Sequence, residues 1–156
     1  MLRTGKKIED INYILDNLRS EDLEEIVALL GNNWRQKFIQ NTLHTDFTIL
    51  LSKNVPIAMG GFVPVNKEKP YIACVWLICS KYIKNNKMLL LKTLKSQVKE
   101  ASYKFDIFYN YIYKSNFEAK KWLRKLGFCF DNPYPHNLKV NKDFEFFYKL
   151  NQKKER

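Results

Sequence analysis

Runs of apolar residues along the chain predict both strands and helices. A nearly continuous apolar run is typical of a strand covered on both faces of a sheet, whereas apolar residues every three or four positions predict a helix with one buried stripe. Gly60 and Gly61, within one predicted strand, indicate a bulge or a close backbone approach. The predicted strands are Tyr13–Leu18, Phe47–Leu51, Ile57–Val63, Tyr71–Cys79, Phe105–Tyr113 and Phe144–Leu150. The predicted helices begin near Ser20, Asn33, Lys87 and Phe117, and they end near Gly31, Leu43, Ala101 and Leu126.

The order of these elements predicts one α/β (α+β) domain. The succession β-α-α-β-β-β-α-β-α-β suits a mixed central sheet of about six to seven strands, flanked by about four helices. Tyr71–Cys79 is almost entirely apolar and is expected to be the central strand. Two segments are expected to lack regular structure: Asp131–Pro135, which breaks it, and Asn151–Arg156, a frayed charged tail.

The segment from Phe105 to Phe130 has the most specific pattern in the chain. A strand with aromatic residues on both faces is followed by a short polar loop, and then by a helix that Gly127 ends. Asn116 is a good N-cap, because its side-chain oxygen can accept a hydrogen bond from a free N–H of the first helical turn. A glycine after a helix supplies the left-handed residue with which many helices end. The segment therefore predicts a strand, a capped helix and a glycine stop.

From its cap onward, this helix has the pattern Asn116-x-x-Ala119-x-x-Trp122-Leu123-x-x-Leu126-Gly127-Phe128. The pattern resembles the acyl-CoA-contacting segment of the GNAT superfamily of N-acetyltransferases. A second likeness covers Val75–Ser80, a lysine-rich helix, Asn110-Tyr111-Ile112 and Trp122–Phe128. These features are similar to the acetyltransferase-like proteins of tailed bacteriophages, which are related to internal virion proteins needed for particle assembly.

The resemblance implies an activity and a cofactor. Residues 1–156 would form a single acyl-CoA N-acyltransferase-like domain that moves an acetyl group from acetyl-CoA to a primary amine, on a small molecule or a protein. In the family, the backbone at the end of the fourth strand pairs with the pantetheine arm, and a turn after it binds the pyrophosphate. The cofactor-binding residues implied by the resemblance are Leu77, Ile78, Cys79, Lys84, Asn85, Asn86, Lys87, Asn116 and Ala119.

The turn after the fourth strand departs from the pattern of the family. Family members have a glycine-rich turn there, and glycine lets main-chain N–H groups approach a phosphate closely. The corresponding segment here, Ser80–Lys87, contains no glycine. Lys84 and Lys87, with free N–H groups near Asn85 and Asn86, could still bind a phosphate electrostatically. The alternative is an ordinary polar loop that caps the next helix.

Few candidates exist for the acid and base of acetyl transfer. The family often places a tyrosine, as general acid, at the position of Leu123, which cannot donate a proton. Tyr109, Tyr111 or Tyr113 could replace it from the neighbouring strand, and Tyr111 is the candidate that could face a cleft; the alternative is a stacked core tyrosine. Glu68, in the loop before the central strand, is the nearest candidate for the general base, and a solvated loop glutamate is the alternative.

The charge of the chain favours acidic partners. The formal net charge is +11 at pH 7, which suits a phosphorylated cofactor or a nucleic acid, although lysines also decorate solvated faces. No binding motif with interleaved exposed aromatic residues is found, so nucleic acid ranks last among the partners. Such contact would use cations of two predicted helices: Lys92, Lys95, Lys99, Lys120, Lys121, Arg124 and Lys125.

Cysteine and histidine spacing predicts no metal site. Cys74 and Cys79 lie in one apolar strand and are expected to be buried, reduced thiols, while His44 and His136 are the only histidines. No segment approaches the about 18 apolar residues of a membrane span. A cytoplasmic protein is therefore expected, or one in the host cytoplasm or the virion interior if a phage encodes it.

Three functions remain open from the sequence. The first is an N-acetyltransferase. The second is a non-catalytic GNAT-fold phage protein that acts in virion assembly or host interaction with phage structural proteins, and it is favoured by the glycine-free turn and by Leu123. The third is a nucleic-acid-binding module.

Overall fold

The computed structural model describes residues 1–68, 70–131 and 142–152. Contacts divide the chain into two compact units. Unit 1 comprises Met1–Val63 and Trp76–Lys92, and unit 2 comprises Pro64–Val75 and Thr93–Arg156. Most of the expected break after Asp131 and most of the charged tail lie outside the described residues, so these two expectations stay predictions.

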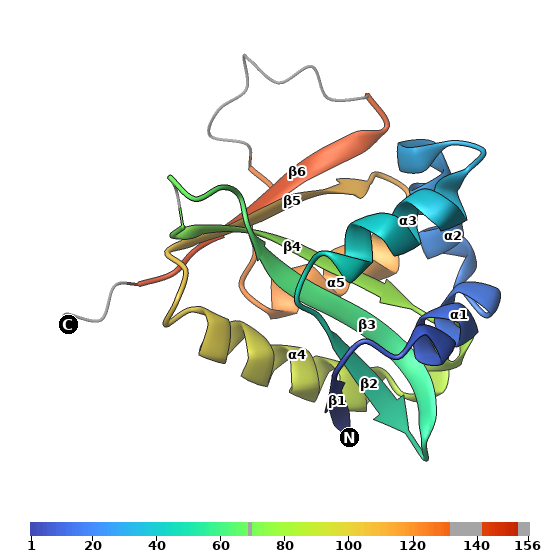
Figure 1. Ribbon diagram of the computed structural model, residues 1–156. Helices are drawn as coiled ribbons and strands as arrows, with labels where there is room; N and C mark the ends of the chain where they lie inside the picture. Colours follow the sequence, from blue (N-terminus) through green and yellow to red (C-terminus); the bar gives the residue numbers. More distant parts are fainter. Residues whose placement is uncertain (69, 132–141, 153–156) are drawn as a thin grey trace. The chain divides into compact units, whose positions relative to one another are not determined.

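The described residues form a mixed sheet of six strands, in the order β1-β2-β3-β4-β5-β6 (Figure 1). The sheet, with five α-helices among the described residues, confirms the predicted fold class. The strands are β1 (Leu2–Thr4), β2 (Thr48–Ser52), β3 (Val55–Pro64), β4 (Ile72–Cys79), β5 (Ile107–Tyr113) and β6 (Phe144–Leu150). The helices are α1 (Ile8–Asp16), α2 (Ser20–Leu30), α3 (Trp34–Leu43), α4 (Lys87–Ala101) and α5 (Phe117–Lys125), with a 3₁₀ helix, η1 (Lys81–Asn85), before α4.

Unit 1 is built on antiparallel strands and has its own apolar core. β1 pairs with β2 and β2 with β3, and the latter two are joined by a tight turn at Lys53 and Asn54 (Figure 1). Both turn residues have positive φ, which matches the twist of a short hairpin. The core brings helical residues against strand residues and comprises Ile11, Ile14, Leu15, Ile26, Phe47, Ile49, Leu51, Met59 and Ile78.

Unit 2 packs aromatic rings on one face of β5 and β6. β5 runs parallel to β4 over three residue pairs and antiparallel to β6 over seven pairs. Phe128, which follows α5, lies with its ring centroid 6.3 Å from that of Phe108 and 5.5 Å from that of Phe147. Phe108, Phe128 and Phe147 are all buried. These rings therefore form the core that fixes the end of α5 on the sheet.

The prediction of a strand over Tyr13–Leu18 is wrong, because this part of the chain belongs mostly to α1. Ile11 and Ile14 are three positions apart and fully buried, as a helical stripe requires. Glu9 and Asp10 lie in the first turn, where the positive end of the helix dipole favours carboxylates. Three consecutive apolar residues at the end of this helix imitate a strand. The first strand is instead Leu2–Thr4.

Gly60 and Gly61 confirm the predicted close backbone approach. A Cβ atom on Gly60 would lie 2.4 Å from the carbonyl oxygen of Trp76, and one on Gly61 would lie 2.5 Å from the carbonyl oxygen of Asp46. Real Cβ atoms do not approach main-chain atoms so closely. Glycine at both positions therefore lets β3 lie against its neighbours in unit 1.

We expect Gly60→Ala to lower the free energy of unfolding by about 2 kcal/mol or more, because the added methyl group must displace main-chain atoms of Trp76. Gly31→Ala is the matched control, since its φ is +74° and nothing lies within 4 Å of the added Cβ. That control should cost only backbone strain, about 1–3 kcal/mol, because with a ψ of −158° it lies in a region essentially restricted to glycine. Urea unfolding measures both. A loss below about 1 kcal/mol for Gly60→Ala would contradict the close approach.

Candidate functional site

The turn after β4 is held by the side chain of Asn86. Its Nδ2 donates a hydrogen bond to the carbonyl oxygen of Tyr82 at 3.0 Å, and the Ser52 hydroxyl donates to its Oδ1 at 2.8 Å. The carbonyl oxygen of Asn86 accepts from the N–H of Leu90 at 3.0 Å, so α4 begins directly after it. The amide is therefore committed to shaping the turn, which makes Asn86 a structural part of the expected phosphate site.

The chemistry around the start of α4 suits a phosphate group. Lys84 and Lys87 are exposed, and the main-chain N–H groups of the first turn have no carbonyl partner within the helix. The positive end of a helix of 15 residues adds to this potential. Ser80, just before η1, is fully buried, and its hydroxyl has no hydrogen-bond partner among the described residues. Cations and main-chain N–H groups donate hydrogen bonds that phosphate oxygens accept, whereas the hydroxyl of Ser80 is too deeply buried to take part.

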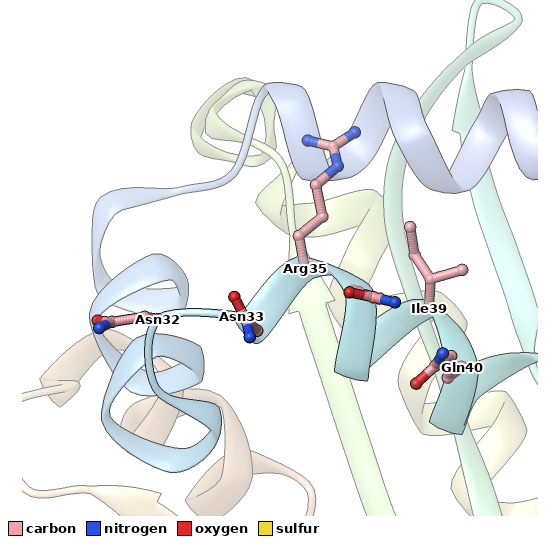
Figure 2. A pocket seen from close by; sticks show the side chains of 6 residues that line it. Asn32, Asn33, Arg35, Ile39 and Gln40 are labelled. Carbon is pink, nitrogen blue, oxygen red and sulfur yellow. The ribbon is translucent and has the colours of Figure 1, made fainter.

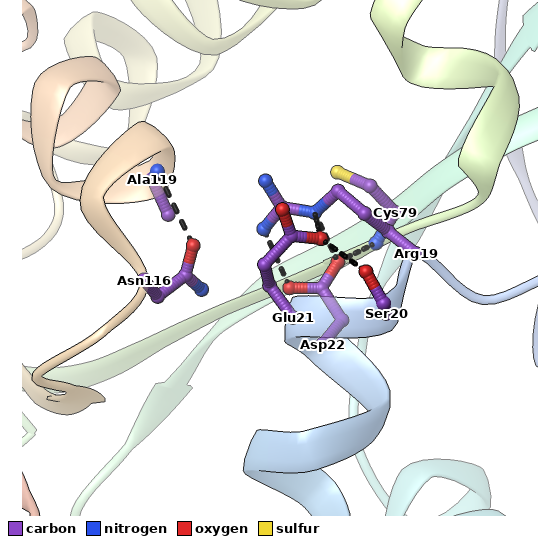
Figure 3. A network of polar contacts seen from close by, with 7 residues as sticks. All are labelled: Arg19, Ser20, Glu21, Asp22, Cys79, Asn116 and Ala119. Carbon is purple, nitrogen blue, oxygen red and sulfur yellow. Dashed lines mark hydrogen bonds and ion pairs between the residues drawn. The ribbon is translucent and has the colours of Figure 1, made fainter.

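At Cys79, the edge of β4 that faces away from β3 already has hydrogen-bond partners within the chain. The N–H of Ser80 donates to the carbonyl oxygen of Ile57 in β3 at 2.9 Å, so the main-chain groups of its neighbours point to the other edge. There the N–H of Cys79 donates to Asp22 Oδ2 at 2.8 Å, and the carbonyl oxygen of Cys79 accepts from the N–H of Arg19 at 3.0 Å (Figure 3). By the same alternation, the main-chain groups of Leu77 lie on this edge.

Arg19 and Asp22 form a buried ion pair. Arg19 Nη2 lies 2.8 Å from Asp22 Oδ1, and the two side chains are 8% and 6% exposed. Burial opposes the charge of the guanidinium, but the Asp22 carboxylate outweighs it, so the pKa of Arg19 is raised. Burial also raises the pKa of Asp22, against the hydrogen bonds that its carboxylate accepts from Arg19 and Cys79. The sequence analysis did not predict this ion pair. The spacing Arg19-x-x-Asp22 is the only local sign of it.

Asn116 caps α5, as predicted from the sequence. Its Oδ1 accepts from the N–H of Ala119 at 3.4 Å, and its side chain is almost fully buried (Figure 3). At the other end of α5, Gly127 has a φ of 87°. The N–H of Phe128 donates to the carbonyl oxygen of Leu123 and that of Gly127 to the carbonyl oxygen of Arg124, which is the Schellman pattern. The carbonyl oxygen of Leu123 thus accepts one of the two hydrogen bonds that end the helix.

A side-chain amide takes over where the main-chain pairing of β4 with β5 ends. The last parallel pair is Cys74 with Tyr109. Asn110 Nδ2 then donates to the carbonyl oxygen of Val75 at 2.6 Å, while the N–H of Tyr111 donates to Asn110 Oδ1 at 2.7 Å. The amide of Asn110 therefore substitutes for one residue of the ladder, and this satisfies groups that would otherwise lack partners.

Tyr111 lies in a row of aromatic rings on β5 and β6. Its ring centroid is 5.3 Å from that of Phe146, which also contacts Tyr109 at 6.1 Å. Burial raises the pKa of Tyr111, so its hydroxyl stays protonated at neutral pH and can donate a proton. Glu68, the candidate base, is exposed in the connection between β3 and β4. Both assignments stay predictions.

Lys120 does not belong to an exposed basic face. It is 8% exposed, and its Nζ lies 2.5 Å from Glu145 Oε2 in β6. Lys121 and Lys125, on the same helix, are exposed. The set of cations that the sequence offered for nucleic-acid contact therefore loses one member to an ion pair inside unit 2.

A shallow hollow at the start of α3 was not foreseen from the sequence. Its volume is about 460 Å³. Figure 2 shows Arg35 reaching from α3 toward α1, where its guanidinium donates to Asp16 Oδ1 at 2.7 Å and to Asn12 Oδ1 at 3.0 Å. The hollow is lined by Asn32, Asn33, Arg35, Gln36, Ile39 and Gln40. Carboxamides dominate it, and no residue of the expected cofactor site takes part.

Within residues 1–68, 70–131 and 142–152, no group of three His, Cys, Asp or Glu side chains could bind a metal ion. Of the helices in this part of the chain, none has the length and apolar character that crossing a membrane requires.

Comparison with solved structures identifies the fold. The chain superposes on an acetyltransferase of the GNAT family from Streptococcus pneumoniae (TM-score 0.63, 14% identity, 96% of this chain and 98% of the other). It also superposes on the GNAT domain of PAT from S. lividans (0.71, 10%, 96% and 89%) and on spermidine N-acetyltransferase from Vibrio cholerae, solved with CoA and spermine (0.67, 12%, 97% and 95%). No protein-family model and no curated protein matches. The chain therefore has the GNAT acetyltransferase fold.

We expect Asn116→Ala to lower the free energy of unfolding by about 1 kcal/mol, because the first turn of α5 loses its side-chain acceptor. Asn116→Ser is the matched control, since it keeps a neutral accepting oxygen at a side chain that is almost fully buried. Chemical denaturation measures both variants. Equal losses for Ala and Ser would show that the cap is not what Asn116 contributes.

Proposed function

We propose that the chain is an N-acetyltransferase that moves an acetyl group from acetyl-CoA to a primary amine. The observation that carries the proposal is the α5 segment, in which Asn116 caps the helix and Gly127 ends it. This segment carries the sequence resemblance to the acetyltransferases, and it lies in a chain that shares their fold over nearly its whole length.

The residues at the start of α4 fit the phosphates of the proposed cofactor. Lys84, Lys87 and the first-turn N–H groups would bind the pyrophosphate, and the main chain of Leu77 would pair with the pantetheine arm. The resemblance also implies a cofactor-binding role for Asn116 and Ala119, at the start of α5 in unit 2. When bound, acetyl-CoA would supply a thioester that an amine can attack.

Proton transfer in the proposed reaction needs a base for the amine and an acid for the thiolate. Tyr111 is the proposed acid, because a tyrosine hydroxyl is protonated at neutral pH and can donate its proton. Glu68, exposed in the connection before β4, is the proposed base, as the carboxylate nearest to that strand in the sequence. Neither residue would form a covalent bond in this reaction. The new bond would join the amine nitrogen of the substrate to the acetyl group of the cofactor.

The acceptor is proposed to be a primary amine on a small molecule or a protein. The V. cholerae neighbour is a spermidine N-acetyltransferase. The net charge of +11 repels polycations, so the charge favours an amine on a neutral or acidic acceptor over a polyamine.

A second candidate function is a non-catalytic GNAT-fold protein. The specific observation in its favour is that Cys79 has both main-chain groups bonded within the chain, to Arg19 and Asp22. The sequence resemblance to the tailed-phage branch would then place the protein in virion assembly or host interaction, with phage structural proteins as partners. This branch, and a location in the host cytoplasm or the virion interior, rest on that resemblance alone.

We expect Lys84→Ala combined with Lys87→Ala to weaken acetyl-CoA binding by about 10-fold or more, because charge-assisted phosphate contacts contribute about 1.5–3 kcal/mol each. Lys7→Ala combined with Lys67→Ala is the control, since both lysines are exposed and the net charge falls equally. Titration calorimetry measures the affinities. If the two double variants bind equally, the phosphate site is not at α4.

We expect Tyr111→Phe to lower kcat by about 100-fold, because the variant keeps the aromatic packing and loses the proton donor. Tyr148→Phe is the control, because the ring of Tyr148 packs on Phe146 as that of Tyr111 does. The assay follows the thiol of CoA released in the presence of a panel of amines. An unchanged kcat for Tyr111→Phe would remove this residue as the acid.

A further inference from the structure

Asn17–Asp22 comprises the connection from α1 to α2 and the first three residues of α2, and it lies beside the end of β4. We call this segment the α1–α2 turn. Leu18 and Ser80 form an antiparallel bridge. The N–H of Lys81 donates to the carbonyl oxygen of Asn17 at 2.7 Å, and the N–H of Arg19 donates to the carbonyl oxygen of Cys79 at 3.0 Å. The turn therefore pairs with the edge of β4 that faces away from β3.

The side chain of Asp22 completes this pairing. Its Oδ2 accepts from the N–H of Cys79 at 2.8 Å, in the way that a carbonyl oxygen of a neighbouring strand would. Arg19 holds the same carboxylate through Nη2 at 2.8 Å and Nε at 3.3 Å, which fixes its orientation (Figure 3). Both main-chain groups of Cys79 thus have partners from the turn.

The turn also brings a negative charge toward α4. Glu21 is the second residue of α2, and its Oε2 accepts from the Ser20 hydroxyl at 3.0 Å. The pKa of Glu21 is lowered, first by a hydrogen bond from its own backbone and then, against its desolvation, by Ser20 and by the charges of Arg19 and Lys87. Since Lys87 opens α4, a carboxylate lies within electrostatic reach of the cation expected to bind a phosphate.

These groups share their chemistry with the proposed cofactor. A pantetheine amide offers a carbonyl acceptor and an N–H donor to a strand edge, and a pyrophosphate offers negative charge to a helix start. The turn offers an acceptor in Asp22, a donor in the N–H of Arg19, and a negative charge in Glu21. One segment of six residues, Asn17–Asp22, therefore presents all three.

We propose that the α1–α2 turn is an internal competitor of the cofactor, so that acetyl-CoA pairs with β4 at Cys79 only after the turn has moved away. This inference rests on the proposed acetyltransferase function and adds a regulation of the same site. The apparent affinity for acetyl-CoA is reduced by the fraction of molecules in which the turn is open. A partner or condition that holds the turn open activates the protein.

The core of unit 1 lies mostly outside the turn. The buried apolar residues of α1 and α2, among them Ile14 and Ile26, lie outside it, and the partly buried Leu18 of the turn packs against this core. The buried side-chain interaction inside the turn is the Arg19–Asp22 pair, and a buried ion pair contributes little net stability compared with apolar residues of similar volume. A pair of this kind therefore suits a contact that must be broken.

The test is a double variant, Arg19→Pro with Asp22→Leu, titrated with acetyl-CoA in a calorimeter. Proline removes the N–H that bonds to Cys79 and fits the φ of −61° at position 19, while leucine removes the carboxylate. Replacing both partners avoids an uncompensated buried charge. Arg35→Ala is the control, because it breaks the exposed ion pair with Asp16 and leaves the turn on β4.

We expect the double variant to bind acetyl-CoA at least 10-fold more tightly than the wild-type chain, and Arg35→Ala to bind like the wild type. Equal affinity of the double variant and the wild type overturns the internal competitor and leaves the acetyl-CoA site intact. No binding by either protein, with both shown to be folded by circular dichroism, overturns the acetyltransferase function as well. The two failures are thus distinguishable.

Amide hydrogen exchange of the wild-type chain keeps the test decisive if the double variant fails to fold. With acetyl-CoA bound, the N–H of Arg19 is expected to lose protection, because its acceptor on Cys79 passes to the cofactor. The N–H of Cys79 should stay protected, since it exchanges Asp22 for the cofactor. An N–H of Arg19 that stays protected at saturating acetyl-CoA overturns the proposal.

Discussion

The end of β4 needs hydrogen-bond partners on both of its edges, and the organisation of unit 1 follows from this need. Cys79 and Ser80 are buried, and a buried N–H or C=O without a partner costs about 1–3 kcal/mol. β3 supplies the partner for Ser80 through Ile57, and the α1–α2 turn supplies the partners for Cys79. The connection between α1 and α2 therefore also pairs with the end of β4, as a neighbouring strand would.

This arrangement couples the stability of unit 1 to the binding of any ligand on the same edge. A ligand that pairs with Cys79 replaces hydrogen bonds already present, so these bonds add little net affinity. The affinity must then come mainly from other contacts. The start of α4 offers the exposed Lys84 and the positive end of the helix dipole. Phosphate binding and release of the turn are therefore expected to go together.

Most of the secondary structure and one part of the candidate site could be predicted because their causes are local. The apolar stripe of a helix, the acceptor of Asn116 and the left-handed Gly127 act within one turn of the residues concerned. The error at Tyr13–Leu18 had a local cause too, since three consecutive apolar residues end a helix whose period begins earlier, at Ile8 and Ile11.

The sequence by itself determined most of the strands and helices after the first helix, how α5 begins and ends, and which cations lie near the start of α4. Only the tertiary structure decided what lies beside the edge of β4. Asp22 and Cys79 are 57 positions apart, and no period or spacing in the chain announces their hydrogen bond. The physical reason is that main-chain N–H and C=O groups are identical in every residue, so their choice of a distant partner depends on how the helices pack around them.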